Sequence, residues 1–218
     1  MKPHALLPAL LLATAPALAE ESAEADAYPS PTCLEDLAEI AVFAAAEVPE
    51  TGDEACTFFT PIQLESVVTE GGPVGLSGTP VLQCDFALQL ARWIRQDAVP
   101  AATLFMDSRL EELATGNGFV CRRRNNAPDG KLSEHAFGNA IDISGFRFDD
   151  ARITIADSEE LSAGEDAFFD AVRKQACDDF TTVLGPGSNA AHADHFHFDL
   201  GRTVRDGVRV AEPYRICE

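Results

Sequence analysis

Two histidine-containing segments, far apart in the sequence, constrain this chain more than any other feature. The first spans residues 133–142 and holds His135 and Asp142, an imidazole and a carboxylate seven residues apart. The second spans residues 192–197 and ends at His197. Three nitrogen and oxygen ligands, with a fourth position left for water, are typical of a catalytic rather than a structural zinc site. The sequence therefore predicts a fold that brings His135, Asp142 and His197 to one Zn²⁺ ion.

The second segment also offers groups for acid–base chemistry. His195 lies two residues before His197, so both side chains project from one face if this segment is a strand. In that position His195 would hydrogen-bond an attacking water molecule or a developing oxyanion. Asp194 and His192 are the candidates for the general base, and their spacing alone does not choose between them.

Alternating hydropathy predicts a strand at each of the two segments. Residues 140–146 alternate isoleucine with polar residues, so Asp142 points away from the apolar face of that strand. Residues 194–200 form the second predicted strand, and Asp199 falls on the same face as both of its histidines. The metal ligands are thus expected on strands that carry one apolar and one polar face.

Apolar spacing predicts helices in other parts of the chain. Helical periodicity extends over residues 34–48 and again over residues 84–99. The second helix should stop at Pro100, because proline lacks the backbone donor that a helix interior needs. Ser162 is expected to cap a third helix that runs through Cys177.

The N-terminal residues have the pattern of an export signal. Lys2 precedes an apolar run over residues 5–15, and Ala17-Leu18-Ala19 has the small-x-small pattern of a signal peptidase site. No other apolar run approaches the length of a membrane span. We therefore expect a periplasmic protein made of a signal peptide, a flexible acidic leader and a single domain, over residues 1–19, 20–32 and 33–218.

Six cysteines in an exported chain favour disulfides over free thiols, because an oxidising compartment lets these bonds persist. No two of them have the C-x-x-C spacing of a zinc knuckle or a redox centre. Six cysteines allow many pairings, and sequence alone does not choose among them. The expected pairs are Cys33 with Cys217, Cys56 with Cys84, and Cys121 with Cys177.

The formal net charge of −20 argues against nucleic acid as a partner, because so acidic a surface repels polyphosphates. The ordinary explanation of such a charge is solubility. Arg122, Arg123 and Arg124 form the one basic cluster. Three consecutive arginines are ordinarily a solvated face, and the alternative is a site that binds an anionic substrate.

These motifs resemble known families. Ser133-x-His135-x-x-Gly138-x-Ala140-x-Asp142, followed by His195-x-His197, is similar to the signature of certain zinc peptidases. These are the D-alanyl-D-alanine carboxypeptidases, the D-Ala-D-Ala dipeptidases and the penicillin-insensitive murein endopeptidases, which share their fold with the hedgehog signalling domain. Residues 119–200 most resemble the bacterial extensin-like C-terminal domain family. The resemblance implies an α+β fold in which a small antiparallel sheet carries the metal site and helices pack against it.

The resemblance also implies roles for individual residues. The implied zinc ligands are His135, Asp142 and His197. In the carboxypeptidase branch a glutamate lies three residues before the last ligand, where this chain has the shorter Asp194. The spacing His192-x-x-His195-x-His197 instead resembles the murein endopeptidase branch, in which extra histidines take over part of that role.

Substrate binding is the remaining role that the resemblance implies. An upstream arginine binds the substrate carboxylate in the carboxypeptidase branch, and Arg122, Arg123 and Arg124 are all possible matches. Ser133, the first residue of the motif, is grouped with these arginines as a substrate-binding residue.

The sequence therefore predicts a periplasmic zinc peptidase that hydrolyses peptide bonds in peptidoglycan. The histidine spacing favours a crosslink endopeptidase over a DD-carboxypeptidase. One alternative is a zinc-containing wall-binding module without turnover, and another is a structural wall protein stabilised by disulfides. The sequence contains no H-E-x-x-H motif and no G-x-S-x-G motif, which excludes two common hydrolase signatures.

Overall fold

The structure is a computed structural model of the 218-residue chain. It describes residues 30–157, 161–201, 204–205, 208–209 and 215–218. The expected signal peptide, residues 1–19, and residues 20–29 of the expected leader lie outside the described residues.

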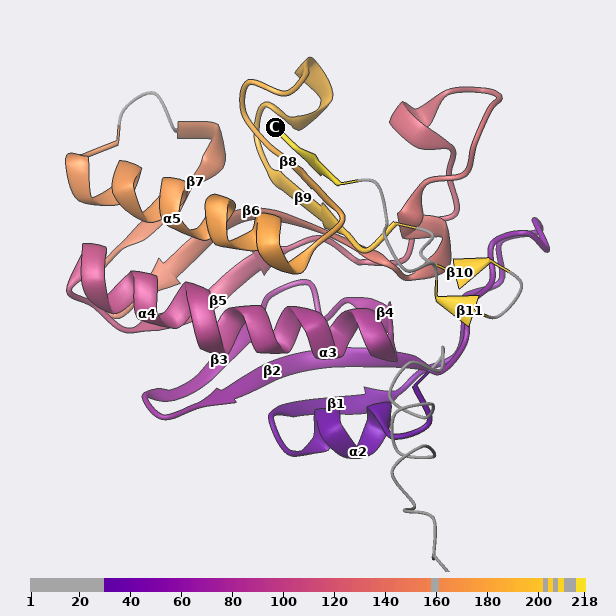
Figure 1. Cartoon of the computed structure of the whole chain (residues 1–218), viewed down its shortest axis with the longest axis horizontal. Coiled ribbons are helices and arrows are strands. Elements are labelled where there is room, and N and C mark those ends of the chain that lie inside the picture. The colour runs from indigo at the N-terminus through magenta and orange to yellow at the C-terminus, as the bar shows by residue number, and fades with distance from the viewer. Residues whose placement is uncertain (1–29, 158–160, 202–203, 206–207, 210–214) are drawn as a thin grey trace, which may run out of the picture.

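Among the described residues, ten strands form one mixed sheet (Figure 1). Its order is β1-β2-β3-β5-β6-β9-β8-β12, with β4 beside β2 and β7 beside β6. The bounds are β1 Ala41–Ala45, β2 Pro61–Thr69, β3 Gly72–Leu76, β4 Val81–Gln83, β5 Leu110–Thr115, β6 Ala140–Phe148, β7 Arg152–Thr154, β8 Thr182–Leu184, β9 Phe196–Asp199 and β12 Ile216–Cys217. Two further strands, β10 (Val204–Arg205) and β11 (Val208–Arg209), pair with each other.

This sheet is larger than the small antiparallel sheet that was expected, and its strands are not all antiparallel. β3 runs parallel to β5, and β12 runs parallel to β8. Between β3 and β5 the chain passes through helices, and a helical crossover of this kind joins parallel strands. The expectation of an α+β fold is confirmed in the coarser sense that helices accompany a mixed sheet.

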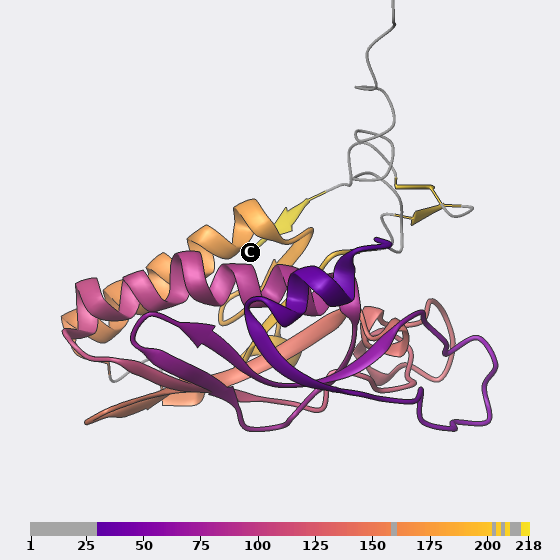
Figure 2. The same cartoon turned by 90° about the horizontal axis from the view of Figure 1, so that it is seen from below.

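The helices cover one face of the sheet. Figure 2 shows α2 (Cys33–Ala38), α3 (Cys84–Trp93) and α5 (Ala163–Asp179) on the same side of the strands. The isoleucines of β6, Ile141 and Ile143, are fully buried in the core that this helical layer shares with the sheet. Within the described residues, no helix combines the length and the apolar composition that crossing a bilayer would require.

Aromatic side chains join β9 to the helical layer. Trp93 of α3 contacts Phe198 of β9, with ring centroids 5.2 Å apart. Phe169 of α5 contacts Phe196, with centroids 5.7 Å apart. Because side chains alternate along a strand, His197 between these two phenylalanines faces the opposite side of the sheet.

The helix that was expected to end at Pro100 continues to Met106. After α3 the chain forms the π-helix η1 (Ile94–Ala98), the short helix α4 (Val99–Ala101) and a second π-helix, η2 (Ala102–Met106). Pro100 therefore lies inside a continuous helical run, where its missing amide leaves one intrahelical hydrogen bond unmade. The prediction was wrong because π-helical bonding shifts the hydrogen-bond register before the proline.

The helix expected over residues 34–48 is also only partly right. α2 ends at Ala38, and β1 begins at Ala41 as a strand antiparallel to β2. Ala41 lies opposite Val67, and Phe43 lies opposite Leu64. Pairing with β2 and burial of these side chains outweigh the local helical spacing.

The cap predicted at Ser162 is confirmed. The Ser162 hydroxyl accepts a hydrogen bond from the Glu165 amide, and the Glu165 carboxylate accepts one from the Ser162 amide. This reciprocal pair is a capping box that satisfies two backbone donors at the start of α5.

All six cysteines form disulfides, as expected, but every expected pairing is wrong. The bridges are Cys33–Cys84, Cys56–Cys121 and Cys177–Cys217. Packing of α2 against α3 brings the first pair together, and pairing of β12 with β8 brings the last cysteine to the end of α5. These contacts depend on tertiary structure, which cysteine spacing does not reveal.

Two carboxylic acids, Asp97 of η1 and Asp179 at the end of α5, lie next to each other in the helical layer. Burial, followed by the charge of Asp179, raises the pKa of Asp97 to about 6. Burial also raises the pKa of Asp179, which accepts a hydrogen bond from Gln89 at 2.8 Å. At neutral pH, ionisation of these two carboxylic acids therefore lowers the free energy of unfolding.

We predict that Asp97→Asn stabilises the protein at pH above about 6 and has little effect at acidic pH. The pKa of Asp97 is higher in the folded chain than in the unfolded chain, so its favourable contribution is complete below about pH 4 and lost as the pH rises through about 6. Urea unfolding should show a gain of about 1 kcal/mol at neutral pH, after allowance for solvent screening of this half-buried group. A gain of equal size in acid, or an equal gain for the exposed control Asp170→Asn, would contradict this explanation.

Candidate metal centre

One turn and two paired strands place the three expected ligands together. His135 lies in the 3₁₀ turn η4 (Glu134–Phe137), which precedes β6 by two residues. Asp142 of β6 lies directly opposite His197 of β9 in antiparallel register. Opposite residues on adjacent strands have Cβ atoms about 5 Å apart, so this register alone brings carboxylate and imidazole together.

Gly138 lets the turn fold back onto the strand. Its backbone is left-handed, with φ 58° and ψ 21°, and its amide donates to the His135 carbonyl at 3.1 Å. A Cβ atom at this position would lie 2.7 Å from the ring of Phe58 and 2.9 Å from the Gln83 amide nitrogen. Both the conformation and the lack of space therefore require glycine.

The ligand atoms form a nearly equilateral triangle. His135 Nε2 lies 3.2 Å from Asp142 Oδ1 and 3.2 Å from His197 Nδ1, and the last two atoms are 3.0 Å apart. Ligands at 2.0–2.1 Å from a tetrahedral zinc ion would lie about 3.3 Å apart. The three residues therefore fit one face of a zinc coordination tetrahedron.

The outer nitrogens of both imidazoles are held by oxygen acceptors. His135 Nδ1 donates to the Gly118 carbonyl at 2.6 Å, and His197 Nε2 donates to Asp199 Oδ2 at 3.0 Å. When both imidazoles are neutral, as metal ligation needs, these bonds leave the lone pairs of His135 Nε2 and His197 Nδ1 directed at each other and at Asp142. Without a metal, protons on the same two nitrogens hydrogen-bond to Asp142. The donor set therefore favours a cation at its centre.

Asp199 was placed on the same strand face as the histidines but was given no role in the sequence analysis. It is only 5% exposed, and its second oxygen accepts the Gly201 amide at 2.8 Å. The alternation His195-x-His197-x-Asp199 was the signal that could have identified it. The Gly118 carbonyl, a backbone group, has no such signal in the sequence.

The electrostatics of the trio also favour positive charge. Burial disfavours the carboxylate of Asp142, but hydrogen bonds from His135 and His197 outweigh burial and hold its pKa well below the ordinary value. Burial likewise disfavours a charged His197, but hydrogen bonds to Asp142 and Asp199 raise its pKa to about 9. The site therefore stabilises a cationic centre between two carboxylates.

His195 lies at the edge of the trio and is supported by Asp194. Its Nε2 is 3.6 Å from Asp142 Oδ1, and its Nδ1 donates to Asp194 Oδ1 at 2.8 Å. The Asp194 side chain is 72% exposed, and its carboxylate is directed at His195. The structure thus brings His195 to the site directly and Asp194 through His195.

His192 completes a cluster of imidazoles. Its ring centroid lies 5.2 Å from that of His195 and 5.6 Å from that of His197, and its Nδ1 bonds to Asn189 at 2.9 Å. Burial and then the charges of the neighbouring histidines lower the pKa of His192 to about 4. His192 is therefore neutral at physiological pH.

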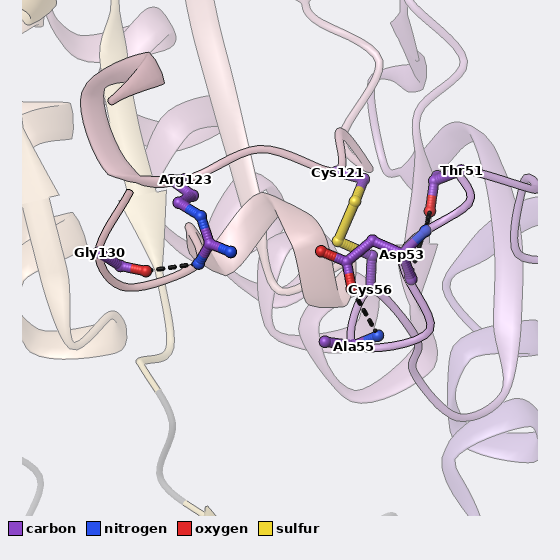
Figure 3. The surroundings of a disulfide bond; sticks show 7 residues. All are labelled: Thr51, Asp53, Ala55, Cys56, Cys121, Arg123 and Gly130. Carbon is purple, nitrogen blue, oxygen red and sulfur yellow. Dashed lines mark hydrogen bonds between the residues drawn. A yellow bond between two sulfur atoms is a disulfide. The ribbon is translucent and has the colours of Figure 1, made fainter. Parts of the chain in front are cut away.

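The three arginines have different surroundings. Arg123 donates to the Gly130 carbonyl within its own loop, as Figure 3 shows. Arg124 forms an ion pair at 3.3 Å with Glu134, whose side chain is buried. The Arg122 side chain makes no ion pair or hydrogen bond with a described residue, and its charge contributes to the low pKa of His192. Of the three, Arg122 is the one that lies free beside the site.

Ser133 is 5% exposed and comes immediately before η4, with its amide bonded to the Arg122 carbonyl. Its backbone position therefore connects the arginine loop to the turn that carries His135. Direct contact of its hydroxyl with a substrate remains a prediction.

A second cluster of possible ligand atoms does not qualify as a metal site. Asp53, Cys56 and Cys121 lie close together, but Figure 3 shows both sulfurs joined in a disulfide. A sulfur in this bond is not a thiolate, which is the form that binds metal. The disulfide instead links the loop around Asp53 to the start of the arginine loop.

A family model described as extensin-like protein C-terminus matches residues 31–211 of the chain. No curated protein and no solved structure shows a significant match to it.

The geometry predicts that Asp199→Ala weakens Zn²⁺ binding by about 10- to 100-fold, because His197 loses the acceptor that orients it. His135→Ala should weaken binding more, since it removes a ligand atom. Competition with a chromogenic chelator measures both affinities. Ser144→Ala, an exposed change on the same strand as Asp142, serves as the control and should bind like the parent. Parental affinity in both the His135 and Asp199 variants would contradict the site.

Proposed function

This chain belongs to the extensin-like protein C-terminus family, and from its site geometry we propose that it is a periplasmic zinc-dependent peptidase that acts on peptidoglycan peptides. The observation that supports this most is the triangle of His135, Asp142 and His197 ligand atoms on the open face of the sheet. We also propose that the family is related to the zinc peptidases with the hedgehog-type fold. The spacing of the two histidine segments supports that relation.

Zinc held by the trio would supply Lewis acidity to a scissile carbonyl and lower the pKa of a water molecule. The protein's part is to hold the ligands in the correct tautomer, which the Gly118 carbonyl and Asp199 do. These two acceptors also keep the imidazoles from rotating away from Asp142. The centre is thus organised in advance of substrate binding.

His195 is our candidate for the general base. Its Nδ1–H donates to Asp194, so the lone pair of Nε2 faces Asp142 and the ligand trio. A proton taken up at Nε2 would be stabilised by the Asp194 carboxylate behind the ring. In this arrangement the short side chain of Asp194 is sufficient, because the aspartate orients His195 and does not need to reach the substrate.

His192 and Arg122 would bind and orient the substrate. The Nδ1 atom of neutral His192 bonds to the Asn189 side chain, so its Nε2 points away from Asn189, and the ring lies beside His195. Arg122 offers a guanidinium without a partner among the described residues, suited to a peptide carboxylate. Arg123 and Arg124 are engaged within their own loop and with Glu134, so we assign them to holding the loop.

The substrate class follows from compartment and from histidine spacing. Three disulfides among the described residues fit an oxidising compartment such as the periplasm. The His192-x-x-His195-x-His197 spacing favours cleavage of crosslinks over removal of a terminal D-alanine. Crosslinked stem peptides are therefore the substrate that we propose first.

Digestion of defined muropeptides tests this proposal. Zinc-loaded protein should convert crosslinked dimers to monomers, and His195→Ala should lower kcat/KM by about 10²- to 10⁴-fold, as expected for loss of a general base. The zinc content of His195→Ala should equal that of the parent, because His195 is not a ligand. Arg122→Ala should raise KM more than it lowers kcat. If dimers, tetrapeptides and pentapeptides all stay intact with zinc-loaded parent protein, the peptidase proposal fails.

A non-catalytic wall-binding module is the second candidate, and the exposed Asp194 in place of a glutamate favours it. Binding to isolated peptidoglycan discriminates between the two. A binding module would keep its wall affinity in His192→Ala and Asp194→Ala while the parent shows no turnover. An enzyme would lose turnover in at least one of these variants.

A further inference from the structure

The strand β1 forms one edge of the sheet, and among the described strands it pairs only with β2 (Figure 1). The Ile40 carbonyl and the Ala46 amide both bond to β2. Because backbone groups alternate in direction along a strand, those of the intervening odd-numbered residues face outward. These residues are Ala41, Phe43 and Ala45.

This edge lacks the features that usually prevent strands from adding to a sheet. Such edges carry charges, prolines or bulges, but residues 40–46 contain neither a charge nor a proline. The register shift in the β1–β2 pair leaves its extra residue, Glu65, on β2, so the outer side of β1 stays regular. Of the three residues whose backbone groups face outward, Ala45 is exposed, Phe43 is partly exposed and Ala41 is buried. Among the described residues, the edge is therefore open to another strand around Phe43 and Ala45.

Carboxylates flank the strand at both ends. Exposed Glu39 precedes β1, and exposed Glu47 follows it. Glu39 also lines a groove of about 1000 Å³, together with Asp36 and Glu70. Arg92 and Arg95 lie on the helical wall of the same groove and would direct a basic ligand toward the β1 side.

The flanking charges disfavour a second copy of the chain as the added strand. In antiparallel self-pairing centred on Phe43, Glu39 of each copy would lie opposite Glu47 of the other. Like charges directly opposite each other destabilise a strand pair, and each copy carries a net charge of −20. The same carboxylates would attract a strand with basic residues at its ends.

We propose that the β1 edge is a docking site for an extended segment of a partner protein, with small or apolar residues in its middle and a basic residue at each end. The segment would add to the sheet as a further strand, in which backbone hydrogen bonds provide affinity and the flanking ion pairs provide selectivity. Three strands, β2, β3 and β5, separate β1 from the strand that carries Asp142. The docking site is therefore independent of the proposed peptidase.

A labelled peptide of sequence Lys-Thr-Val-Thr-Val-Thr-Val-Thr-Lys is the probe, and fluorescence anisotropy with the full chain measures its affinity. The peptide should bind, and added salt should weaken binding, because ion pairs at exposed positions are screened. The same peptide with glutamate in place of both lysines should bind at least about tenfold more weakly. Equal binding of both peptides, or no binding of the lysine peptide, would overturn the proposal.

Variants of β1 separate strand addition from general attraction to an acidic protein. Ala45→Pro removes an outward amide and should weaken binding about tenfold or more, whereas Ala45→Val retains that amide and should bind like the parent. The double variant Glu39→Gln with Glu47→Gln should weaken binding of the lysine peptide. The control is the double variant Asp166→Asn with Asp170→Asn on α5, which removes the same charge from exposed positions elsewhere. This control should bind the lysine peptide like the parent.

Circular dichroism shows whether each variant is folded, and the charge variants keep the test valid if Ala45→Pro does not fold. Unchanged peptide binding by folded Ala45→Pro, or by the Glu39 and Glu47 double variant, would overturn the proposal. Light scattering on the parent adds one further test. A dimer that Ala45→Pro converts to a monomer would identify a second copy of this chain as the occupant and would also overturn it.

Discussion

The pairing of β6 with β9 is the interaction on which the candidate metal centre depends. It sets Asp142 directly opposite His197, and the turn before β6 then brings His135 to the same point. A shift of one residue in this register would turn His197 to the core and Phe198 to the open face. The burial of Phe196 and Phe198 against α3 and α5 therefore holds the register, and through it the ligand geometry.

The two faces of the sheet have different roles: one packs against the helices and stabilises the fold, and the other carries the candidate metal centre. The helical face is filled with aromatic and aliphatic side chains, while Asp142 and His197 lie on the face turned away from the helices. Polar support for the candidate metal centre comes from buried acceptors, above all Asp199 and the Gly118 carbonyl. The buried carboxylate of Glu134 pairs with the exposed side chain of Arg124, which ties the arginine loop to the turn that holds His135.

Sequence reasoning predicted which side chains meet at the candidate site better than it predicted the fold, for a physical reason. The candidate ligands lie on short segments whose alternation and glycine position are local, so the proximity of His135, Asp142 and His197 could be predicted before any tertiary structure was known. β1 and the disulfide pairs depend on contacts between distant segments, and local patterns gave the wrong answer for residues 41–45 and for every cysteine. The prediction that a helix ends at Pro100 was wrong for a third reason. The π-helical turn before Pro100 changes the hydrogen-bond pattern, and the helix continues past the proline.

The order of the disulfides along the chain has a consequence for biogenesis. Cys33 bonds to Cys84 and Cys56 bonds to Cys121, so these two bridges interleave, and only Cys177–Cys217 joins neighbouring cysteines. Oxidation that linked thiols in their order along the chain would join Cys33 to Cys56 and trap a non-native loop. Maturation of this protein therefore requires either folding of the N-terminal half before oxidation or a reductive isomerase that exchanges the first bonds formed.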